Sequence, residues 1–180
     1  MKKLFILLLI FILTACTKEI SQKNPHEILL AMKNYSCTME ISFFSNKNTN
    51  KYIANQTYSS IGKYSMEFLD DENLKINYEN SILNIHSKSL NASNEIINYE
   101  EINKNPLFLS YFINIYFNTE EKENIKTSTD SINITLPNSN EYLYSANLIF
   151  KNNKPHTLTY YDKNGNEKVN ILYSEFTLTA

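Results

Sequence analysis

The sequence lacks arginine and tryptophan, and only two of its 180 residues are glycine. Phosphate-binding loops need several glycines close together, so the isolated Gly62 and Gly165 exclude a Gly-rich phosphate loop. The formal net charge is only -2 at pH 7, and the 17 basic residues, all lysine, are scattered along the chain. Because the lysines form no basic stripe, the sequence lacks the charge pattern of a nucleic-acid-binding protein, and we set that class aside.

An apolar run near the N-terminus is typical of a secretion signal. Two lysines precede Leu4–Leu13, a run well short of the roughly 20 apolar residues that span a bilayer. Residues 13–16, Leu-Thr-Ala-Cys, resemble the lipobox of bacterial lipoproteins, which makes Cys16 the expected lipidation site. Two acyl chains hold a protein on a membrane where one myristoyl chain holds it only marginally. The alternative is an ordinary secretion signal followed by a chance cysteine.

The domain organisation follows from this signal. We expect residues 1–15 to be a cleaved signal peptide, residues 16–24 a lipidated N-terminus with a flexible tether, and residues 25–180 one folded domain. With Cys16 lipidated, Cys37 has no disulfide partner, so a disulfide framework is excluded. Cys37 lies in an alternating segment, where a small, inert, buried thiol is favoured over a nucleophile.

Local patterns predict a short helix followed by a long series of strands. Asn24 can cap a helix from Pro25 to about Asn34, because proline costs no hydrogen bond at the first position and Glu27 opposes the helix dipole. From Tyr35 the apolar period changes to two, which is typical of antiparallel strands joined by short turns. The predicted strands are Tyr35–Phe44, Lys51–Ser59, Lys63–Leu69, Leu74–Tyr78, Ile82–Ser87, Ile125–Thr129, Ser131–Leu136 and Tyr142–Phe150.

Two later segments carry stronger signals. The nearly all-apolar stretch Pro106–Asn118 predicts a helix that must be enclosed on nearly every face, and we place it in the concavity of a curved sheet with Phe112 inside. The segment Pro155–Phe176 predicts a hairpin. Its Asn164 and Gly165 are expected to supply the positive backbone dihedrals that a tight turn needs.

The order of these elements resembles the lipoprotein-carrier fold of LolA and LolB. Gly62–Glu67 is similar to the Gly-Lys-Tyr-Arg-Met-Glu strand start often seen in that family, with Ser65 in place of arginine, and Tyr160–Gly165 and Ile171–Phe176 resemble its last hairpin. This resemblance covers the mature domain. It implies an α+β, mainly β fold, in which a strongly curved antiparallel sheet forms an incomplete barrel. An N-terminal helix and a buried apolar helix would pack in its opening.

Within that group, a small, lipidated, tyrosine-rich chain looks most like the clostridial germination lipoproteins of the GerS type. That family has no known active site and acts as the obligatory partner of a spore-cortex N-acetylmuramoyl-L-alanine amidase, CwlD. The resemblance implies a non-catalytic, membrane-anchored lipoprotein that supports such an amidase in cortex modification and germination. It also implies the extracytoplasmic face of the cell membrane, which in spores is the forespore or spore membrane facing the cortex.

The residues that could carry chemistry form no convincing set. The three histidines are far apart in the sequence, and none stands at a metal-ligand spacing from cysteines or carboxylates. The acidic clusters fall in predicted turns, where solvated loop tips are favoured over a general acid and base. We therefore expect no enzyme, no catalytic residue, no metal and no cofactor. The residues concerned are His26, His86, His156, Asp70–Glu72, Glu100–Glu101 and Glu120–Glu123.

Three classes of function remain open. The favoured one is a protein-binding module, in which the anchored half-barrel docks an enzyme through exposed strand edges or a tyrosine-rich face. The second is a lipid or lipoprotein carrier or receptor of the LolA/LolB type, with an acyl chain in a pocket under the helix at residues 106–118. The third is a hydrolase, which lacks a convergent triad. Long edge strands leave a homodimer open as well.

Overall fold

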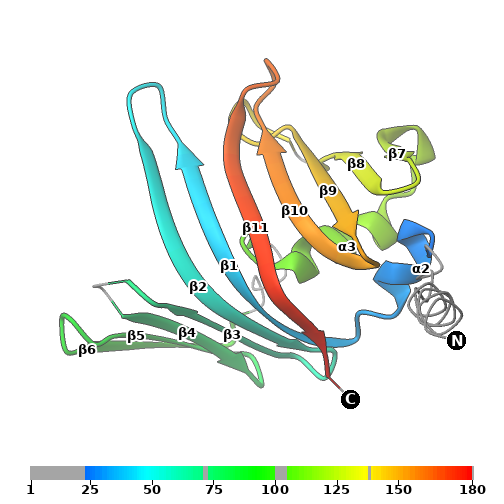
Figure 1. Ribbon diagram of the computed structural model, residues 1–180. Coiled ribbons are helices and arrows are strands. Elements are labelled where there is room, and N and C mark those ends of the chain that lie inside the picture. The colour runs from blue at the N-terminus through cyan, green and yellow to red at the C-terminus, as the bar shows by residue number, and fades with distance from the viewer. Residues whose placement is uncertain (1–22, 71–72, 100–104, 138, 180) are drawn as a thin grey trace, which may run out of the picture.

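The protein folds around one open antiparallel sheet of 11 strands (Figure 1). The computed structural model describes residues 23–70, 73–99, 105–137 and 139–179. The predicted mainly β class, a curved sheet that does not close, is confirmed. The strands are β1 (Asn34–Phe44), β2 (Thr49–Ser59), β3 (Lys63–Phe68), β4 (Leu74–Glu79), β5 (Ile82–Ser87), β6 (Ala92–Ile97), β7 (Ile125–Thr127), β8 (Ser131–Thr135), β9 (Ser145–Lys151), β10 (Lys154–Tyr161) and β11 (Glu167–Leu178). Their order across the sheet is β6-β5-β4-β3-β2-β1-β11-β10-β9-β8-β7.

The sheet is strongly bent, and two helices lie on its concave side. In Figure 1, β3 to β6 turn away below the other strands, α3 (Leu109–Asn118) lies behind β9 to β11, and α2 (Pro25–Leu30) lies beside the ends of β9 and β10. Strand β1 shows the resulting alternation, since every second side chain from Tyr35 to Ile41 is buried. A register shift between Ser36 and Thr38, opposite β11, adds to the bend, because bulges increase local strand curvature.

Helix α2 begins where the sequence predicts and ends earlier. The Asn24 Oδ1 accepts hydrogen bonds from the backbone N–H groups of His26 and Glu27 at 2.8 and 3.3 Å, so Asn24 is the N-cap. The helix was expected to reach about Asn34 but ends at Leu30. The prediction overran because Asn34 already belongs to β1, where sheet pairing outweighs helix propensity.

Most predicted strands are confirmed to within two residues at their ends. The strand expected from Tyr142 begins instead at Ser145. Strand β6 was not predicted, because its apolar and polar residues do not alternate. All six of its residues are exposed, and its register with β5, from Ile82 opposite Ile97 to Ser87 opposite Ala92, holds it in the sheet.

Asparagine replaces glycine in the tight turns of this glycine-poor chain. Asn80 (φ 53°) and Ser81 (φ 62°) join β4 to β5, and Asn152 (φ 53°) and Asn153 (φ 59°) join β9 to β10. Two central residues with positive φ define the type I′ turn, whose twist matches that of the flanking strands. Asparagine enters the left-handed region more readily than other non-glycine residues, so these hairpins close without glycine.

The last hairpin forms as predicted, but only one of its two expected residues is left-handed. Gly165 has φ 82°, whereas Asn164 is not among the residues with positive φ. The Asp162 N–H donates to the Asn166 carbonyl at 2.9 Å, and the Gly165 N–H donates to the Asp162 carbonyl at 3.0 Å. Three residues therefore bridge the strands, and this loop length needs a left-handed residue only at its last position.

Helix α3 fills the concavity, as expected, but it is not enclosed on every side. It begins at Leu109 rather than Pro106, with Phe108 as N-cap. Leu109, Phe112 and Ile115 are buried, which confirms the predicted inward face. The opposite side of the helix faces solvent, so the expected enclosure was too broad. Its exposed residues are Asn114, Phe117 and Asn118.

The predicted signal peptide, residues 1–15, lies outside the described residues. The same holds for Cys16 and for residues 17–22 of the tether, so cleavage and lipidation stay predictions. Within the described ranges, no helix has both the length and the apolar character needed to cross a membrane.

Candidate functional site

The concave side of the sheet is packed by α3. Phe108, Leu109 and Phe112 are 0% exposed and belong to one core with inward side chains of the sheet, among them Met39 and Leu148. The side chains of the helix thus fill the space between helix and sheet where the carrier hypothesis puts an acyl chain. A ligand could enter there only by displacing large apolar side chains from the core, at a cost comparable to making cavities of their size.

Gln56 on β2 ties the start of α3 to the sheet. This residue is 1% exposed, and its Oε1 accepts hydrogen bonds from the Tyr35 hydroxyl at 2.9 Å and from the Leu109 N–H at 3.3 Å. Its Nε2 donates to the Leu107 carbonyl at 3.1 Å. Because the N-cap Phe108 has no side-chain acceptor, Gln56 supplies from another element the oxygen that a helix N-terminus needs.

Aromatic rings form a row across the sheet, from β11 through β1, β2, β3 and β4 to the residue Tyr99 after β6. Each ring contacts the next, with centroids 5.0 to 6.5 Å apart, in stacked or edge-to-face arrangements. Burial raises the pKa of Tyr64, in the middle of the row, to about 12. The row therefore helps to hold the bent strands together. Its members are Phe176, Tyr35, Tyr58, Tyr64, Tyr78 and Tyr99.

A second group of aromatic side chains is open to solvent and lines a groove of about 290 Å³. The rings of Phe43, Tyr52 and Phe68 meet edge to face, with centroids 5.8 and 6.1 Å apart. Each of these rings is only half-buried. Partly exposed aromatic anchors around an apolar hollow are typical of protein interfaces. We call this feature the aromatic groove; its lining residues are Phe43, Asn50, Tyr52, Phe68, Asp70 and Leu74.

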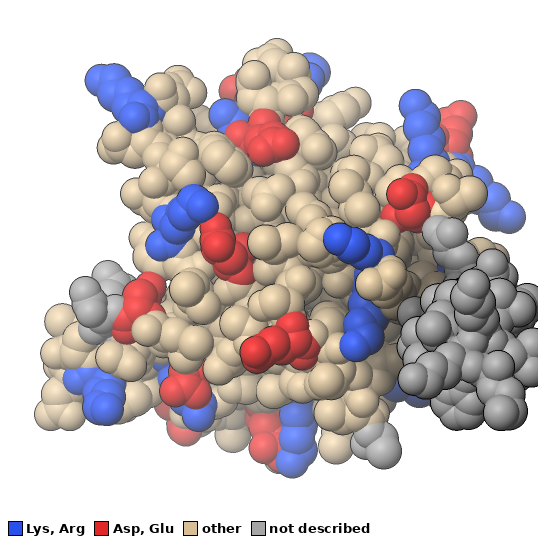
Figure 2. Space-filling view, in the orientation of Figure 1, with Lys and Arg blue, Asp and Glu red and all other residues tan. Residues whose placement is uncertain are grey.

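Charge does not single out any region of the opposite, convex face. Figure 2 shows this face, with lysines and carboxylates interspersed and no continuous patch of either sign. Several of these charges are paired across strands, such as Lys51 with Glu40 at 2.7 Å and Lys63 with Glu79 at 2.6 Å. An exposed pair of this kind adds little to stability or binding. The aromatic groove is therefore the better candidate for recognition.

The three histidines lie on separate elements, α2, β5 and β10, and His26 and His86 contact neighbouring side chains. His26 joins α2 to α3, with its Nδ1 3.0 Å from the Tyr116 hydroxyl and its ring 5.7 Å from that of Phe117. The His86 Nδ1 lies 2.8 Å from the Ser93 hydroxyl across β5 and β6. Among the residues that the structure describes, no group of three His, Cys, Asp or Glu side chains could hold a metal ion.

Cys37 is buried in β1, as predicted for an inert thiol. It is 5% exposed, and burial raises its pKa to about 12. The thiolate needed for nucleophilic attack is therefore scarce at physiological pH.

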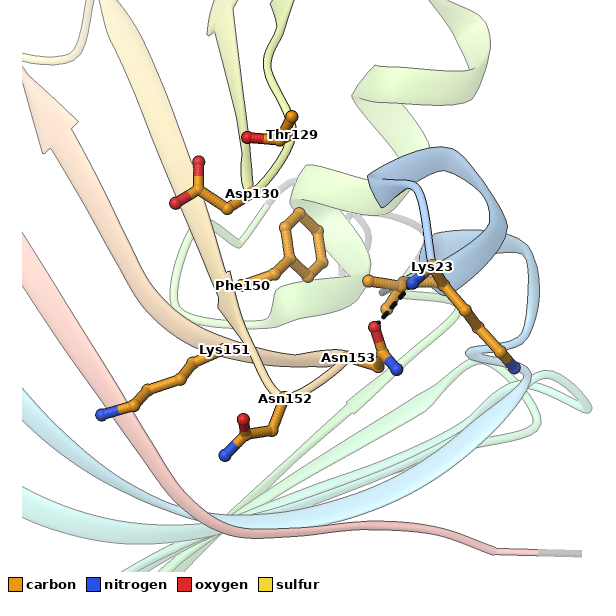
Figure 3. Close-up of a pocket in the computed structure, with 8 residues that line it drawn as sticks. Lys23, Thr129, Asp130, Phe150, Lys151, Asn152 and Asn153 are labelled. Carbon is orange, nitrogen blue, oxygen red and sulfur yellow. Dashed lines mark hydrogen bonds between the residues drawn. The ribbon is translucent and has the colours of Figure 1, made fainter. Parts of the chain in front are cut away.

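A polar pocket of about 250 Å³ lies where the described chain begins, beside the β9–β10 turn (Figure 3). The Lys23 N–H donates to the Asn153 Oδ1 at 2.8 Å and thereby attaches the end of the tether to this turn. In Figure 3 the amino groups of Lys23 and Lys151 point away from each other and from the Asp130 carboxylate. The pocket thus lies where the tether joins the domain, and its charged side chains do not converge on a common point.

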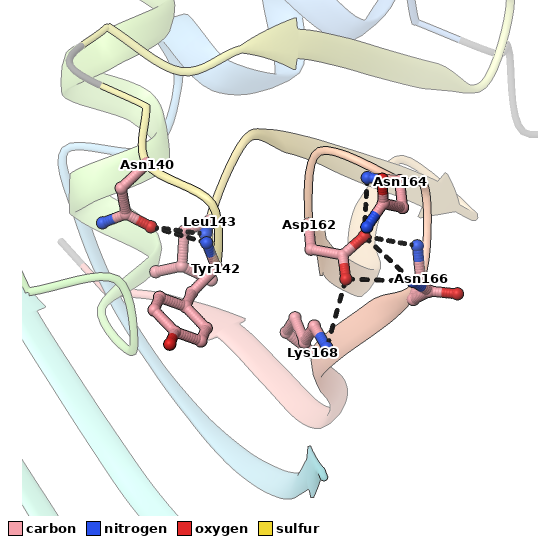
Figure 4. A network of polar contacts seen from close by, with 7 residues as sticks. All are labelled: Asn140, Tyr142, Leu143, Asp162, Asn164, Asn166 and Lys168. Carbon is pink, nitrogen blue, oxygen red and sulfur yellow. Dashed lines mark hydrogen bonds and ion pairs between the residues drawn. The ribbon is translucent and has the colours of Figure 1, made fainter. Parts of the chain in front are cut away.

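The described acidic residues Asp70, Glu120 and Glu121 lie outside helices and strands, as expected, while a different carboxylate organises a turn. Glu123 lies instead in a short 3-10 helix, Lys122–Asn124, and residues 71, 72, 100 and 101 fall outside the described ranges. Figure 4 shows the Asp162 carboxylate accepting hydrogen bonds from the Asn164 and Asn166 N–H groups. The Asn166 side chain and these bonds hold the pKa of Asp162 well below its usual range. Asp162 therefore stabilises the last hairpin.

Neither Gln56 nor the aromatic groove was predicted from the sequence. The alternation in β2 places Tyr52, Ala54, Gln56 and Tyr58 on one face, so a glutamine in phase with inward residues was a usable signal for a buried polar tie. The groove had no comparable signal, because it depends on the register of three strands and on where each of them ends.

Two solved structures, with TM-scores of 0.54, show a shared fold. The GerS lipoprotein in complex with the CwlD amidase from Clostridioides difficile is 21% identical, with 86% of this chain and 91% of that chain covered and a TM-score of 0.54. An uncharacterized conserved protein from Thermus thermophilus is 10% identical, with 86% of each chain covered and a TM-score of 0.54. The LolA superfamily protein NE2245 from Nitrosomonas europaea is 10% identical, with 88% and 94% covered and a TM-score of 0.41.

Comparison with curated proteins finds no match. A family model, by contrast, matches the whole chain, residues 1–180. Its family is described as sporulation protein YdcC-like. The chain therefore belongs to the YdcC-like sporulation protein family.

Proposed function

We propose that this protein is a membrane-anchored, non-catalytic partner of a spore-cortex peptidoglycan amidase of the CwlD type, needed for cortex modification and germination. Membership of a sporulation family supports the cellular setting. The fold shared with the GerS lipoprotein, whose structure was determined in complex with the CwlD amidase, supports the kind of partner.

The observation that carries this proposal is the filled concavity beside an open aromatic groove. A carrier needs interior space, but Phe108 and Phe112 are 0% exposed where the cargo would lie. A docking module needs exposed anchors on a rigid frame, and Tyr52 and Phe68 provide them on paired strands. The amidase would bind at the aromatic groove. It could be activated only to the extent that its active form binds more tightly than its inactive form.

The test mixes the full chain with the amidase of the same genome and measures association by calorimetry and amidase turnover on cortex peptidoglycan. The full chain alone should leave peptidoglycan intact and should raise turnover when the amidase is present. Tyr52→Ser and Phe68→Ser should weaken association about 30-fold or more, since interface anchors cost about 2 kcal/mol or more when removed. Leu90→Ser is the matched control, because Leu90 is 77% exposed in the β5–β6 turn.

Absence of association between the wild-type chain and the amidase would contradict the proposal. So would spores of a deletion strain whose cortex is modified normally. If Leu90→Ser weakened amidase binding as much as Tyr52→Ser does, the aromatic groove would not be the interface.

The proposed anchor is the lipid on Cys16, on the extracytoplasmic side of the membrane. Cys16→Ala should abolish labelling with radioactive fatty acid and release the protein from the membrane fraction, because the thiol is the acceptor for the diacylglycerol. Retained labelling would refute lipidation at this residue without affecting the amidase assays.

A further inference from the structure

Strand β2 extends past its neighbour β3 and leaves a length of sheet edge without a described strand beside it. Pairing between the two runs from Ser59 opposite Lys63 to Ala54 opposite Phe68. Beyond that point β2 continues to Thr49, and on its other side it stays paired with β1 throughout. Figure 1 shows the β1–β2 hairpin rising well past the ends of β3 to β6. We call this edge, residues 49–52, the β2 notch.

The backbone groups that face the β2 notch follow from the hydrogen-bond alternation of an antiparallel strand. The last bond across to the β3 side runs from the Leu69 N–H to the Ile53 carbonyl, at 2.8 Å. Successive residues of a strand direct their N–H and C=O to opposite sides. Lys51 and Thr49 therefore turn theirs toward the same edge as Ile53, and no described strand pairs with them there.

Apolar side chains flank the β2 notch on both faces of the sheet. On the concave side the aromatic groove begins at Tyr52. On the convex side Ile53 and Leu69 are neighbours, and each is 50% exposed. A row of backbone donors and acceptors is complemented by an extended polypeptide, and apolar surface on either side favours apolar residues in that polypeptide.

We propose that an extended segment of the partner amidase adds to the sheet at the β2 notch as a short strand, antiparallel to β2 and in line with β3. An apolar side chain of that segment enters the aromatic groove, because alternate side chains of the added strand face the concave side. This inference rests on the proposed function and specifies how the same groove is used. The backbone bonds give affinity, and the groove selects the side chain.

The test removes one N–H from the β2 notch and leaves the β1–β2 ladder intact. Lys51→Pro deletes an N–H that points to the open edge, where proline is tolerated in a sheet. Lys51→Ala is the matched control, because both variants lose the 2.7 Å ion pair with Glu40 and only proline loses the N–H. We expect the full chain in mild detergent to bind the amidase about tenfold more weakly as Lys51→Pro than as Lys51→Ala, with equal melting temperatures.

Hydrogen exchange on the wild-type complex gives a second reading that requires no variant. The amide protons of Thr49 and Lys51 should exchange more slowly when the amidase is bound, since they become hydrogen-bonded. This measurement decides the matter if Lys51→Pro fails to fold.

The outcomes separate the two proposals. If the wild-type chain does not bind the amidase, the proposed function fails and the inference fails with it. If Tyr52→Ser weakens binding while both Lys51 variants bind equally and the two amides stay unprotected, the docking function stands and strand addition is refuted. If Lys51→Pro instead abolishes self-association in sedimentation runs and leaves amidase binding unchanged, the strand comes from a second copy, which also refutes the inference.

Discussion

Replacing Gln56 with alanine tests how the sheet holds α3 in place. The side chain is 1% exposed and bonds groups on two segments: the Tyr35 hydroxyl on β1, and the Leu107 carbonyl and Leu109 N–H at the start of α3. Alanine removes every one of these bonds and leaves a gap between β2 and the start of the helix.

The size of the expected loss in the free energy of unfolding depends on which hydrogen-bond partners of Gln56 water can reach in the variant. Tyr35 and Leu109 are 1% and 0% exposed, whereas Leu107 is only half-buried. A buried donor left unpaired costs about 1–3 kcal/mol, so the two enclosed donors together cost about 2–6 kcal/mol. Neighbours in one network are not additive, and we expect a loss of about 3–4 kcal/mol in the free energy of unfolding. That loss is large against the roughly 5–15 kcal/mol of a whole domain.

Urea unfolding followed by circular dichroism measures this loss. Asn55→Ala is the control, since Asn55 is the next residue on β2 and its exposed side chain bonds only Thr38 on the convex face among the contacts described. The control should change stability by less than about 0.5 kcal/mol. A Gln56→Ala variant as stable as this control would refute the role of Gln56 in tying the start of α3 to the sheet.

The remaining predictions concern the core, the last hairpin and the buried thiol. Phe112→Ala should cost about 3–5 kcal/mol because a fully buried ring leaves a cavity, and an unchanged thermal melt would place α3 outside the core. Asp162 should stabilise the fold above about pH 4 and lose this effect as the pH falls toward its lowered folded pKa, because only the unfolded carboxyl is protonated in that window. Urea titrations of the wild type and Asp162→Asn should therefore converge on acidification, and divergence would contradict the prediction. Cys37 should resist a thiol reagent in the folded protein and react after unfolding, since burial raises its pKa to about 12; labelling followed by mass spectrometry checks this.

Much of the fold was readable from local patterns, because each pattern reports an interaction between residues close in sequence. The Asn24 cap depends on N–H groups two and three residues away, and the alternation from Tyr35 onward depends on one strand facing one core. Elements held by distant partners were misjudged. Strand β6 exists through its pairing with β5, and α2 ends at Leu30 because the chain must enter the sheet.

The sequence by itself determined the mainly β class and the apolar helix inside the sheet, while the N-terminal signal and the lipidation of Cys16 stay predictions. Only the tertiary structure decided how the helix is tied to the sheet and which binding features the surface carries. The bond from Gln56 to Leu109 crosses 53 positions of chain, and the aromatic groove joins Phe43, Tyr52 and Phe68 from three strands. The β2 notch depends on where β3 stops relative to β2. Such features arise from long-range register and sheet curvature, which burial of the whole core sets and which no local pattern encodes.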